Sequence, residues 1–339
     1  MFKVIQFRAG APDKFRQFTS GEYVLVKLNN KNLVDLSLDD LKRVDDHTYF
    51  LSTSELDIPY AATLPKDIQK RCILPQTVEG IIDYEKFVPK DSYFYQHLEE
   101  ATDFFYGLKR VYKPEEFCFI QDDLTGEDKY ALKVTKGTGG SRGVVVINSS
   151  RIPQGGAREQ YQSITKDLIQ SVIDVANEYG ANIIRQKLSY PNLTDYRKYC
   201  AEYILRNGKL VVYKWEEPVG DSTNYDHLTI IRNEYTDKMI KQLANYMLSL
   251  GITDGIFGID GYTNYADFCS ICEQNWRQEN CLFTFEALGL DFIEMYLHPE
   301  VDWLSKVPYG EYKVIRYWRA AIFDIKNDKE WEKQFHEQY

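Results

Sequence analysis

Residues 133–143 read Lys-Val-Thr-Lys-Gly-Thr-Gly-Gly-Ser-Arg-Gly, and the run Val-Val-Val-Ile follows at 144–147. Glycine tolerates positive φ angles, so a loop rich in it lets several backbone N–H groups converge on an anion. Lys133 stands close enough before the loop to reach the same anion, and Arg142 adds a planar fork of donors suited to phosphate oxygens. The segment predicts a loop that joins two antiparallel strands and folds over phosphate groups.

The residues after the loop exclude two well-known phosphate sites. A P-loop needs Gly-Lys-Ser/Thr at the start of a helix, and the dinucleotide fingerprint is also followed by a helix. Here Gly143 precedes a β-branched run, which favours a strand. An ordinary hairpin loop whose glycines bind no ligand remains the alternative.

Around the loop, the spacing of apolar residues and the turn signals predict a series of strands and helices. Asn207-Gly208 is the pair favoured in type I′ hairpin turns. In order, we expect strand 131–134, the glycine loop, strand 144–147, helix 159–179, strand 182–188, a hairpin of 199–205 and 210–215, a helix ending before Gly251, and strands 255–260 and 281–286. The first helix is expected to bury one face, made of Ile164, Leu168, Val172 and Val175.

The last two of these strands each end in a carboxylate, Asp260 and Glu286. A carboxylate at the end of an apolar strand is costly without a compensating cation. Magnesium prefers oxygen ligands and usually bridges one or two carboxylates to substrate phosphates. Asp260 and Glu286 are therefore candidate metal ligands.

This order of elements resembles the ATP-grasp fold over residues 90–295, whereas the first 90 residues show no such resemblance. The resemblance implies an α/β (α+β) protein in which the nucleotide lies between two small antiparallel sheets, with an additional N-terminal α/β domain. It divides the chain into an N-terminal domain at 1–92, a central subdomain with the glycine-rich flap at 93–182, and a C-terminal subdomain with the metal site at 183–339.

The resemblance implies that the cofactors are ATP and Mg²⁺. Lys133 would bind the α- or β-phosphate, and residues 186–188 would meet adenine. Lys90 has a simple alternative role as a surface lysine beside a helix cap. The full set of residues implied in nucleotide binding is Lys90, Lys133, Gly139, Gly140, Ser141, Arg142, Gly143, Gln186, Lys187 and Leu188.

The metal ligands implied by the resemblance are Asp260 and Glu286, but the sequence departs from the family at the second one. ATP-grasp enzymes usually have Glu-x-Asn there, whereas this chain has Glu286-Ala287-Leu288. Asp291 or Glu294 could replace the missing ligand. A descendant that binds nucleotide without turnover is the other interpretation.

The residues implied in catalysis are Arg197, Arg142 and Lys214. Arg197 resembles the basic residue that faces the transferred phosphate or the substrate carboxylate, and Lys214 could point into the same cleft. The implied activity is an ATP-dependent, ADP-forming ligation. A carboxylate attacks the γ-phosphate to give an acylphosphate, and an amine then displaces the phosphate. The substrate would be an amino acid, a peptide or a protein tail.

Three other functions stay open on the sequence alone. A nucleotidyltransferase similar to RNA ligases would use Lys136, in Lys-Gly-Thr-Gly, as its nucleophile, with Glu202 and Asp254 among its later elements. It would form a covalent lysyl-AMP adduct, which an ATP-grasp ligase would not. The second is a non-catalytic ATP-binding assembly factor, and the third is a small-molecule kinase.

Composition limits the partners. The 339 residues carry 41 Lys and Arg against 51 Asp and Glu, and the net charge of −10 argues against a general nucleic-acid surface. No apolar run reaches the ~18–20 residues of a membrane span, and the start of the chain reads as a strand rather than a signal peptide. Cys269, Cys272 and Cys281 have no histidine nearby to complete a zinc site. We expect a soluble, cytoplasmic protein that binds a small-molecule or peptide substrate.

Overall fold

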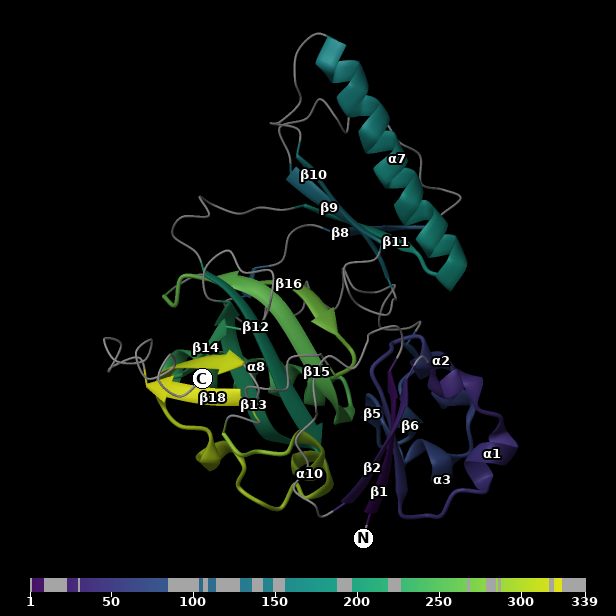
Figure 1. Cartoon of the computed structure of the whole chain (residues 1–339), viewed down its shortest axis with the longest axis vertical. Coiled ribbons are helices and arrows are strands. Elements are labelled where there is room, and N and C mark those ends of the chain that lie inside the picture. The colour runs from purple at the N-terminus through teal and green to yellow at the C-terminus, as the bar shows by residue number, and fades with distance from the viewer. Residues whose placement is uncertain are drawn as a thin grey trace.

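The computed structural model describes residues 2–8, 23–29, 31–84, 104–105, 109–113, 129–135, 143–148, 156–187, 197–218, 227–266, 269–278, 285, 288–316 and 320–324. The described elements form three sheets, each with helices packed against it (Figure 1). The prediction of a mixed α/β fold with separate antiparallel sheets is confirmed.

The N-terminal sheet is parallel and has the strand order β2-β1-β3-β4. Short helices alternate with its later strands, which is typical of an α/β unit. Phe50, Ile58 and Ile68 are fully buried in the layer between them. The elements of this part are β1 (Phe2–Arg8), β2 (Tyr23–Asn29), η1 (Leu33–Asp35), α1 (Leu38–Lys42), β3 (Thr48–Ser52), α2 (Asp57–Thr63), α3 (Lys66–Gln69), β4 (Cys72–Ile73), β5 (Gln76–Thr77) and β6 (Gly80–Ile81).

The second sheet is small and antiparallel, with the strand order β10-β9-β11-β8. The long helix α7 covers one face of it, and the third sheet lies on the other side (Figure 1). Leu132 and Ile183 pack beneath α7 against Ile169, Val172 and Ala176. The elements are β8 (Lys109–Tyr112), β9 (Lys129–Val134), β10 (Val144–Asn148), α7 (Gly156–Tyr179) and β11 (Ile183–Lys187).

The position of β11 bears on the domain boundary. Although β11 begins at residue 183, it pairs with both β9 and β8 of the small sheet. We therefore propose that the junction between the central and C-terminal subdomains lies after residue 187 instead of after residue 182.

The buried face of α7 differs from the predicted one. Ile164 and Leu168 are 52% and 43% exposed, while Thr165, Ile169, Val172 and Ala176 face the sheet. Both sets of residues follow a spacing of three and four, so periodicity alone fits either face. The sheet selects the face that carries Ala176, where the helix can approach closely.

Gly143 closes the glycine loop at its second strand. Its φ angle is +76°, and its carbonyl oxygen accepts a hydrogen bond of 3.1 Å from the N–H of Val134. A Cβ atom at this position would lie 2.9 Å from the Cγ atoms of Val134 and 3.0 Å from Val175 Cγ1. Both the backbone angle and the space therefore require glycine.

We expect Gly143→Ala to lower the free energy of unfolding by about 1–3 kcal/mol, because alanine is strained at positive φ and collides with two valines. Urea denaturation measures the effect. The matched control is Gly156→Ala at the start of α7, where a Cβ atom meets nothing within 4 Å. Equal stability of the two variants would contradict the assignment of Gly143.

The third sheet is the largest, and its strands follow the order β18-β17-β14-β13-β12-β15-β16-β7. All of these pairings are antiparallel except that of β16 with β7. Its elements are β7 (Phe104–Phe105), β12 (Arg197–Arg206), β13 (Lys209–Pro218), β14 (His227–Arg232), α8 (Glu234–Ser249), β15 (Ile252–Thr263), β16 (Cys269–Asn275), α10 (Phe292–Leu297), η4 (Leu304–Lys306), β17 (Gly310–Arg316) and β18 (Ala320–Asp324).

Two local predictions in this part are confirmed. Asn207 and Gly208 have φ angles of 52° and 71°, as a type I′ turn between β12 and β13 requires. Helix α8 buries Ile240, Leu243 and Met247, and Gly251 follows its end with a positive φ of 81°.

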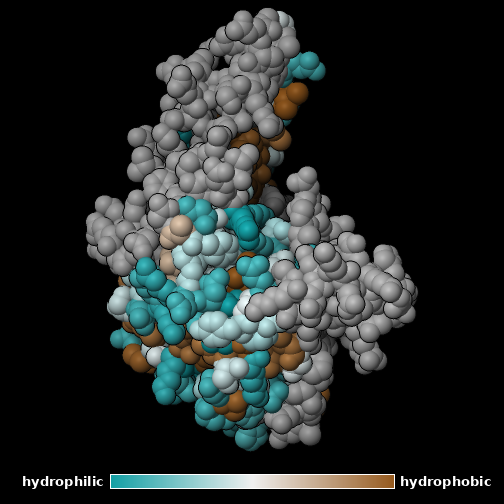
Figure 2. Space-filling view, turned by 90° about the vertical axis from the view of Figure 1, so that its left-hand side faces the viewer, coloured by the Kyte–Doolittle hydropathy of each residue, from teal (hydrophilic) through white to brown (hydrophobic). Residues whose placement is uncertain are grey.

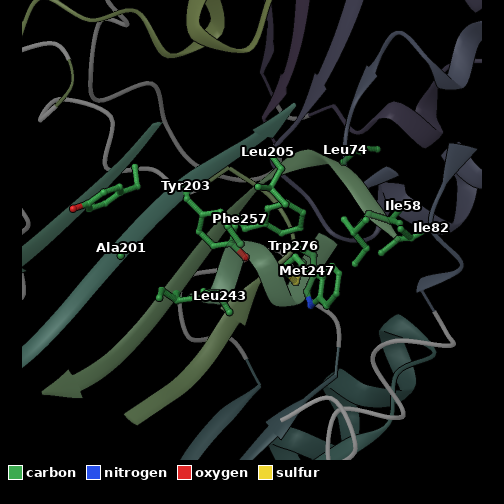
Figure 3. Close-up of a cluster of buried hydrophobic side chains, with 14 of the residues drawn as sticks. Ile58, Leu74, Ile82, Ala201, Tyr203, Leu205, Leu243, Met247, Phe257 and Trp276 are labelled. Atoms are coloured by element: carbon green, nitrogen blue, oxygen red, sulfur yellow. The ribbon is translucent and has the colours of Figure 1, made fainter. Parts of the chain in front are cut away.

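The two faces of the large sheet carry different cores. One face packs on α8 and includes Tyr203, Trp215 and Phe257. The opposite face packs on α10 and includes Ile204, Val212 and Ile256. Figure 3 shows that the α8-side core runs on into the N-terminal domain, since Ile58, Leu74 and Ile82 lie in the same cluster as Phe257 and Trp276.

The described surface agrees with the composition. Hydrophilic residues cover much of the described surface in Figure 2, with a band of hydrophobic residues across its lower part. Among the described helices, none is both long enough and apolar enough to cross a membrane.

Candidate functional site

Two predicted nucleotide-binding residues share one face of the small sheet. Leu132 and Ile183 lie in the core under α7, so alternation along β9 and β11 places Lys133 and Gln186 on the opposite face. That face is turned toward the large sheet (Figure 1). That both residues lie beside a nucleotide between the sheets stays a prediction.

Gln186 carries an unused hydrogen-bond acceptor. The residue is 2% exposed, and its Oε1 atom has no hydrogen-bond partner. An unpaired buried acceptor costs about 1–3 kcal/mol, so such an atom in a folded protein needs an explanation. A ligand with a donor, such as the amino group of adenine, would satisfy it.

Several predicted nucleotide ligands fall outside the described residues. These are Lys90, Gly139, Gly140, Ser141, Arg142 and Leu188, together with the side chain of Lys187. Their roles stay predictions. The structure does describe the strands on either side of the loop. β9 and β10 pair as antiparallel strands, with Lys133 opposite Val144.

The face of the large sheet away from α8 carries two rows of polar residues. Each row crosses four neighbouring strands, β13, β12, β15 and β16, at matched register positions. Opposed residues in such rows have Cα atoms about 4.5–5.5 Å apart. The first row is Glu216, Cys200, Asp260 and Glu273, and the second is Lys214, Glu202, Gly258 and Asn275.

Lys214 lies on this face of the sheet between two carboxylates. Its Nζ atom is 3.0 Å from Glu216 Oε1 and 3.4 Å from Glu202 Oε2, and all three side chains are at most 3% exposed. This buried ion-pair cluster lies on the same face of the sheet as Asp260.

Asp260 and its register neighbours are candidate magnesium ligands. Asp260 Oδ1 accepts a hydrogen bond of 2.7 Å from Cys200 Sγ. Glu273 stands directly opposite Asp260, and Asn275 follows two positions later, opposite Gly258, which has no side chain to fill the space. Magnesium prefers carboxylate and amide oxygens, and the register brings residues of these types to neighbouring positions.

Residues 273–275 read Glu-Gln-Asn and match the Glu-x-Asn pattern that the resemblance implies at residue 286. Glu286 lies outside the described residues, so its role as a ligand stays a prediction. Asp291 has a different role, because it caps α10 and accepts a hydrogen bond of 2.9 Å from the Tyr23 hydroxyl. Glu294 belongs to that same short helix.

Arg277, which the sequence analysis does not single out, follows the Glu-x-Asn strand. It is 9% exposed and donates to Gln278 O at 3.1 Å and to Asn275 Oδ1 at 3.3 Å, while its Nε atom has no partner. In the described part of the chain no carboxylate pairs with it. A buried guanidinium of this kind, beside the candidate metal ligand Asn275, is suited to an anionic substrate group.

Arg197 does not join this site. It lies 3.6 Å from Glu217 and stacks over the ring of Tyr265 at 5.8 Å, on the α8 side of the sheet. Burial raises the pKa of Glu217, against the hydrogen bond from Tyr265 and the charge of Arg197. The prediction that Arg197 and Lys214 share a cleft is therefore wrong, because alternation along β12 and β13 places them on opposite faces.

The residues proposed for a nucleotidyltransferase have structural partners. Asp254 accepts hydrogen bonds from Arg206 at 2.8 Å and from the N–H of Asn207 at 3.1 Å, so it holds the β12–β13 hairpin. Glu202 belongs to the buried ion pair with Lys214. Lys136 lies outside the described residues.

The cysteine pattern gives no zinc site in the described structure. Cys269 is buried in β16, and its Sγ atom lies 3.3 Å from the Tyr199 hydroxyl. No group of three Cys, His, Asp or Glu residues gathers as a metal site in the ranges described above. Cys281 falls outside them.

No model of a protein family matches the sequence, and no curated protein matches it either. Solved structures do match in shape. D-alanine–D-alanine ligase from Bacillus anthracis complexed with ATP aligns with a TM-score of 0.51 at 9% identity, over 91% of this chain and 100% of that one.

Two further solved structures match to a similar degree. Carboxyaminoimidazole ribonucleotide synthase from Aspergillus clavatus complexed with ATP aligns with a TM-score of 0.52 at 13% identity, over 93% of this chain and 81% of that one. L-amino acid ligase from Bacillus licheniformis aligns with a TM-score of 0.52 at 11% identity, over 93% and 79%. At sequence identities of 9–13%, the similarity to these structures shows a shared fold and no more.

Proposed function

We propose that this chain, which has the ATP-grasp fold, is a magnesium-dependent ligase that uses ATP to join a carboxylate to an amine. The observation that carries the proposal is the set formed by Asp260, Glu273 and Asn275 at neighbouring register positions, with the unpaired Arg277 directly after them. A metal site beside an anion site is what transfer of a phosphate to a carboxylate requires.

In this proposal the nucleotide lies between the small and the large sheet. Lys133 would neutralise phosphate charge, and Gln186 Oε1 would accept a hydrogen bond from the adenine amino group. Asp260, Glu273 and Asn275 would hold Mg²⁺, which would supply charge neutralisation at the phosphates. Glu273 thereby takes the place that the sequence analysis gives to Glu286.

The reaction proceeds in two balanced steps. A substrate carboxylate oxygen, oriented by Arg277, attacks the γ-phosphorus, and the bond to the β-phosphate oxygen breaks to release ADP. An amine nitrogen then attacks the acylphosphate carbonyl, phosphate leaves, and a C–N bond forms with loss of one proton. Two structures similar in fold are named as ligases of amino acids, which supports an amino acid, peptide or protein tail as substrate.

The test is mass spectrometry of the protein and its nucleotide products after incubation with ATP, Mg²⁺ and pooled amino acids and peptides. ADP, phosphate and an unmodified protein support the ligase. A protein mass raised by one AMP would identify Lys136 as a nucleophile and overturn the ligase in favour of a nucleotidyltransferase. ATP binding without any product would favour the non-catalytic module.

We expect Lys133→Met to weaken ATP binding roughly ten- to a hundredfold, the effect of losing one charge-assisted hydrogen bond of about 1.5–3 kcal/mol. Calorimetric titration with MgATP measures it. Lys209→Met, an exposed lysine at the start of β13, is the matched control and should bind normally. Unchanged affinity in Lys133→Met would contradict the position given to the phosphates.

A further inference from the structure

Cys200 faces the candidate metal ligand Asp260 across two strands of the large sheet. Cys200 in β12 stands directly opposite Asp260 in β15 in their antiparallel register. The residues next to them in sequence, Tyr199, Ala201 and Ile259, all belong to the core on the α8 side. Because side chains alternate along a strand, Cys200 and Asp260 lie together on the other face of the sheet, the face that carries the candidate metal ligands.

The thiol of Cys200 makes a defined contact with the Asp260 carboxylate. Its Sγ atom donates a hydrogen bond of 2.7 Å to Asp260 Oδ1, and Cys200 is 6% exposed. A thiol is a weak donor, but a charged acceptor strengthens the bond, and burial keeps water from replacing it. Both side chains take part in further interactions as well. What this bond adds is a fixed partner for one identified oxygen of the carboxylate.

The orientation of a carboxylate decides how well it can hold magnesium. Rotation about the χ2 angle of aspartate has broad minima, so an aspartate without a directional bond presents its oxygens over a wide range of angles. Mg²⁺ requires near-ideal octahedral geometry, whereas Ca²⁺ accepts more oxygen ligands in flexible arrangements. A hydrogen bond to one carboxylate oxygen narrows the range of angles, and loss of such an outer-shell partner typically lowers metal affinity about 10- to 100-fold.

We infer that Cys200 is a positioning residue, which orients the Asp260 carboxylate for Mg²⁺ and thereby favours Mg²⁺ over Ca²⁺ beside the nucleotide. The inference rests on the proposed function, in which Asp260 would hold the metal. Cys200 acts through Asp260 and needs no contact with the metal or with the nucleotide. A thiol that only filled space would affect stability and leave the choice of metal unaltered.

The experiment compares ATP binding with and without a divalent ion. Calorimetric titration of each protein gives dissociation constants for ATP with EDTA, for MgATP and for CaATP. The ratio of the first constant to each of the others measures the metal effect, and it requires no substrate and no turnover. The variants are Cys200→Ala, which removes the thiol, Cys200→Val, which fills the space without a donor, and Cys200→Ser, which keeps a donor.

We expect the Mg²⁺ effect to fall about tenfold or more in Cys200→Ala and in Cys200→Val, since each loses the outer-shell partner of Asp260. The Ca²⁺ effect should change by less than about twofold, because flexible coordination tolerates a reoriented carboxylate. The affinity for ATP with EDTA should stay unchanged in all variants. Cys200→Ser should keep most of the Mg²⁺ effect, because its hydroxyl can donate to the same oxygen.

Cys269→Ala is the matched control. Cys269 is also buried, and its Sγ atom lies 3.3 Å from the Tyr199 hydroxyl, in the core on the α8 side of the same sheet. This variant loses the same group as Cys200→Ala, so urea denaturation should show a comparable loss of stability. Its Mg²⁺ effect should equal that of the unmodified protein.

The possible failures give different results. If the unmodified protein binds ATP equally well in EDTA and in Mg²⁺, or if Cys200→Ala and Cys200→Val keep the full Mg²⁺ effect, the positioning role is overturned while ATP binding stands. An equal loss in Cys269→Ala would also overturn it, since the loss would then follow from stability. If the unmodified protein binds no ATP with or without a metal, the proposed function itself has failed.

Discussion

Asp260→Asn is expected to slow ADP release about a thousandfold, because losing a metal carboxylate removes several kcal/mol of charge stabilisation at the phosphates. Asparagine has the same shape as aspartate and can still accept the hydrogen bond from Cys200, so the sheet should stay intact. The measurement is a coupled ADP assay at saturating ATP, with circular dichroism to verify folding.

Asp254→Asn is the matched control for this variant. Asp254 lies on the same strand but pairs with Arg206 at the hairpin end, so its loss should reduce stability and leave the rate of ADP release unchanged. A parallel pair, Glu273→Gln and Glu286→Gln, decides between the two candidate second ligands. The register predicts that only Glu273→Gln reproduces the loss; the reverse result would restore Glu286 as the ligand.

Arg277→Met is expected to lower kcat/KM for the carboxylate substrate by about a hundred- to a thousandfold, the range for loss of one preorganised donor. Affinity for ATP should change little, since Lys133 and the metal ligands remain. Arg277→Lys should restore only part of the activity, because an ammonium cannot reproduce the planar fork of a guanidinium. Steady-state kinetics with the identified substrate give these values.

The free energy of unfolding distinguishes a role of Arg277 in substrate binding from a role in the fold. Arg277 has no carboxylate partner in the described structure, so we expect Arg277→Met to lower the free energy of unfolding by no more than ~1 kcal/mol. Arg206→Met is the counterpart, since it leaves Asp254 partly buried and unpaired, and should cost ~2 kcal/mol without affecting kcat. Equal losses of stability in the two variants would argue that Arg277 serves the fold.

Local signals were sufficient to predict much of this structure. The strands that flank the glycine loop, the type I′ turn at Asn207-Gly208 and the end of α8 before Gly251 all depend on a few adjacent residues, and all are confirmed. The topology of the N-terminal sheet could not be predicted, because parallel pairing between β1, β2 and β3 depends on distant residues.

The candidate site was predicted only in part. Asp260 was identified from its position at the end of an apolar run, but Glu273 and Asn275 were not, because the sequence does not show which strand pairs with β15. The Glu-x-Asn pattern thirteen residues after Asp260 was visible in the sequence; what was missing was the pairing of β15 with β16. Arg197 was misplaced for a similar reason, since the face of a strand residue is set by register.

The separate core of the small sheet has a consequence for how the molecule holds together. The described N-terminal domain shares its apolar clusters with the large sheet, whereas Leu132, Ile147, Ile169, Val172, Ala176 and Ile183 form a cluster of their own. We therefore expect the small sheet to unfold separately from the rest of the described structure. A nucleotide bound between the sheets would add its binding free energy to their association.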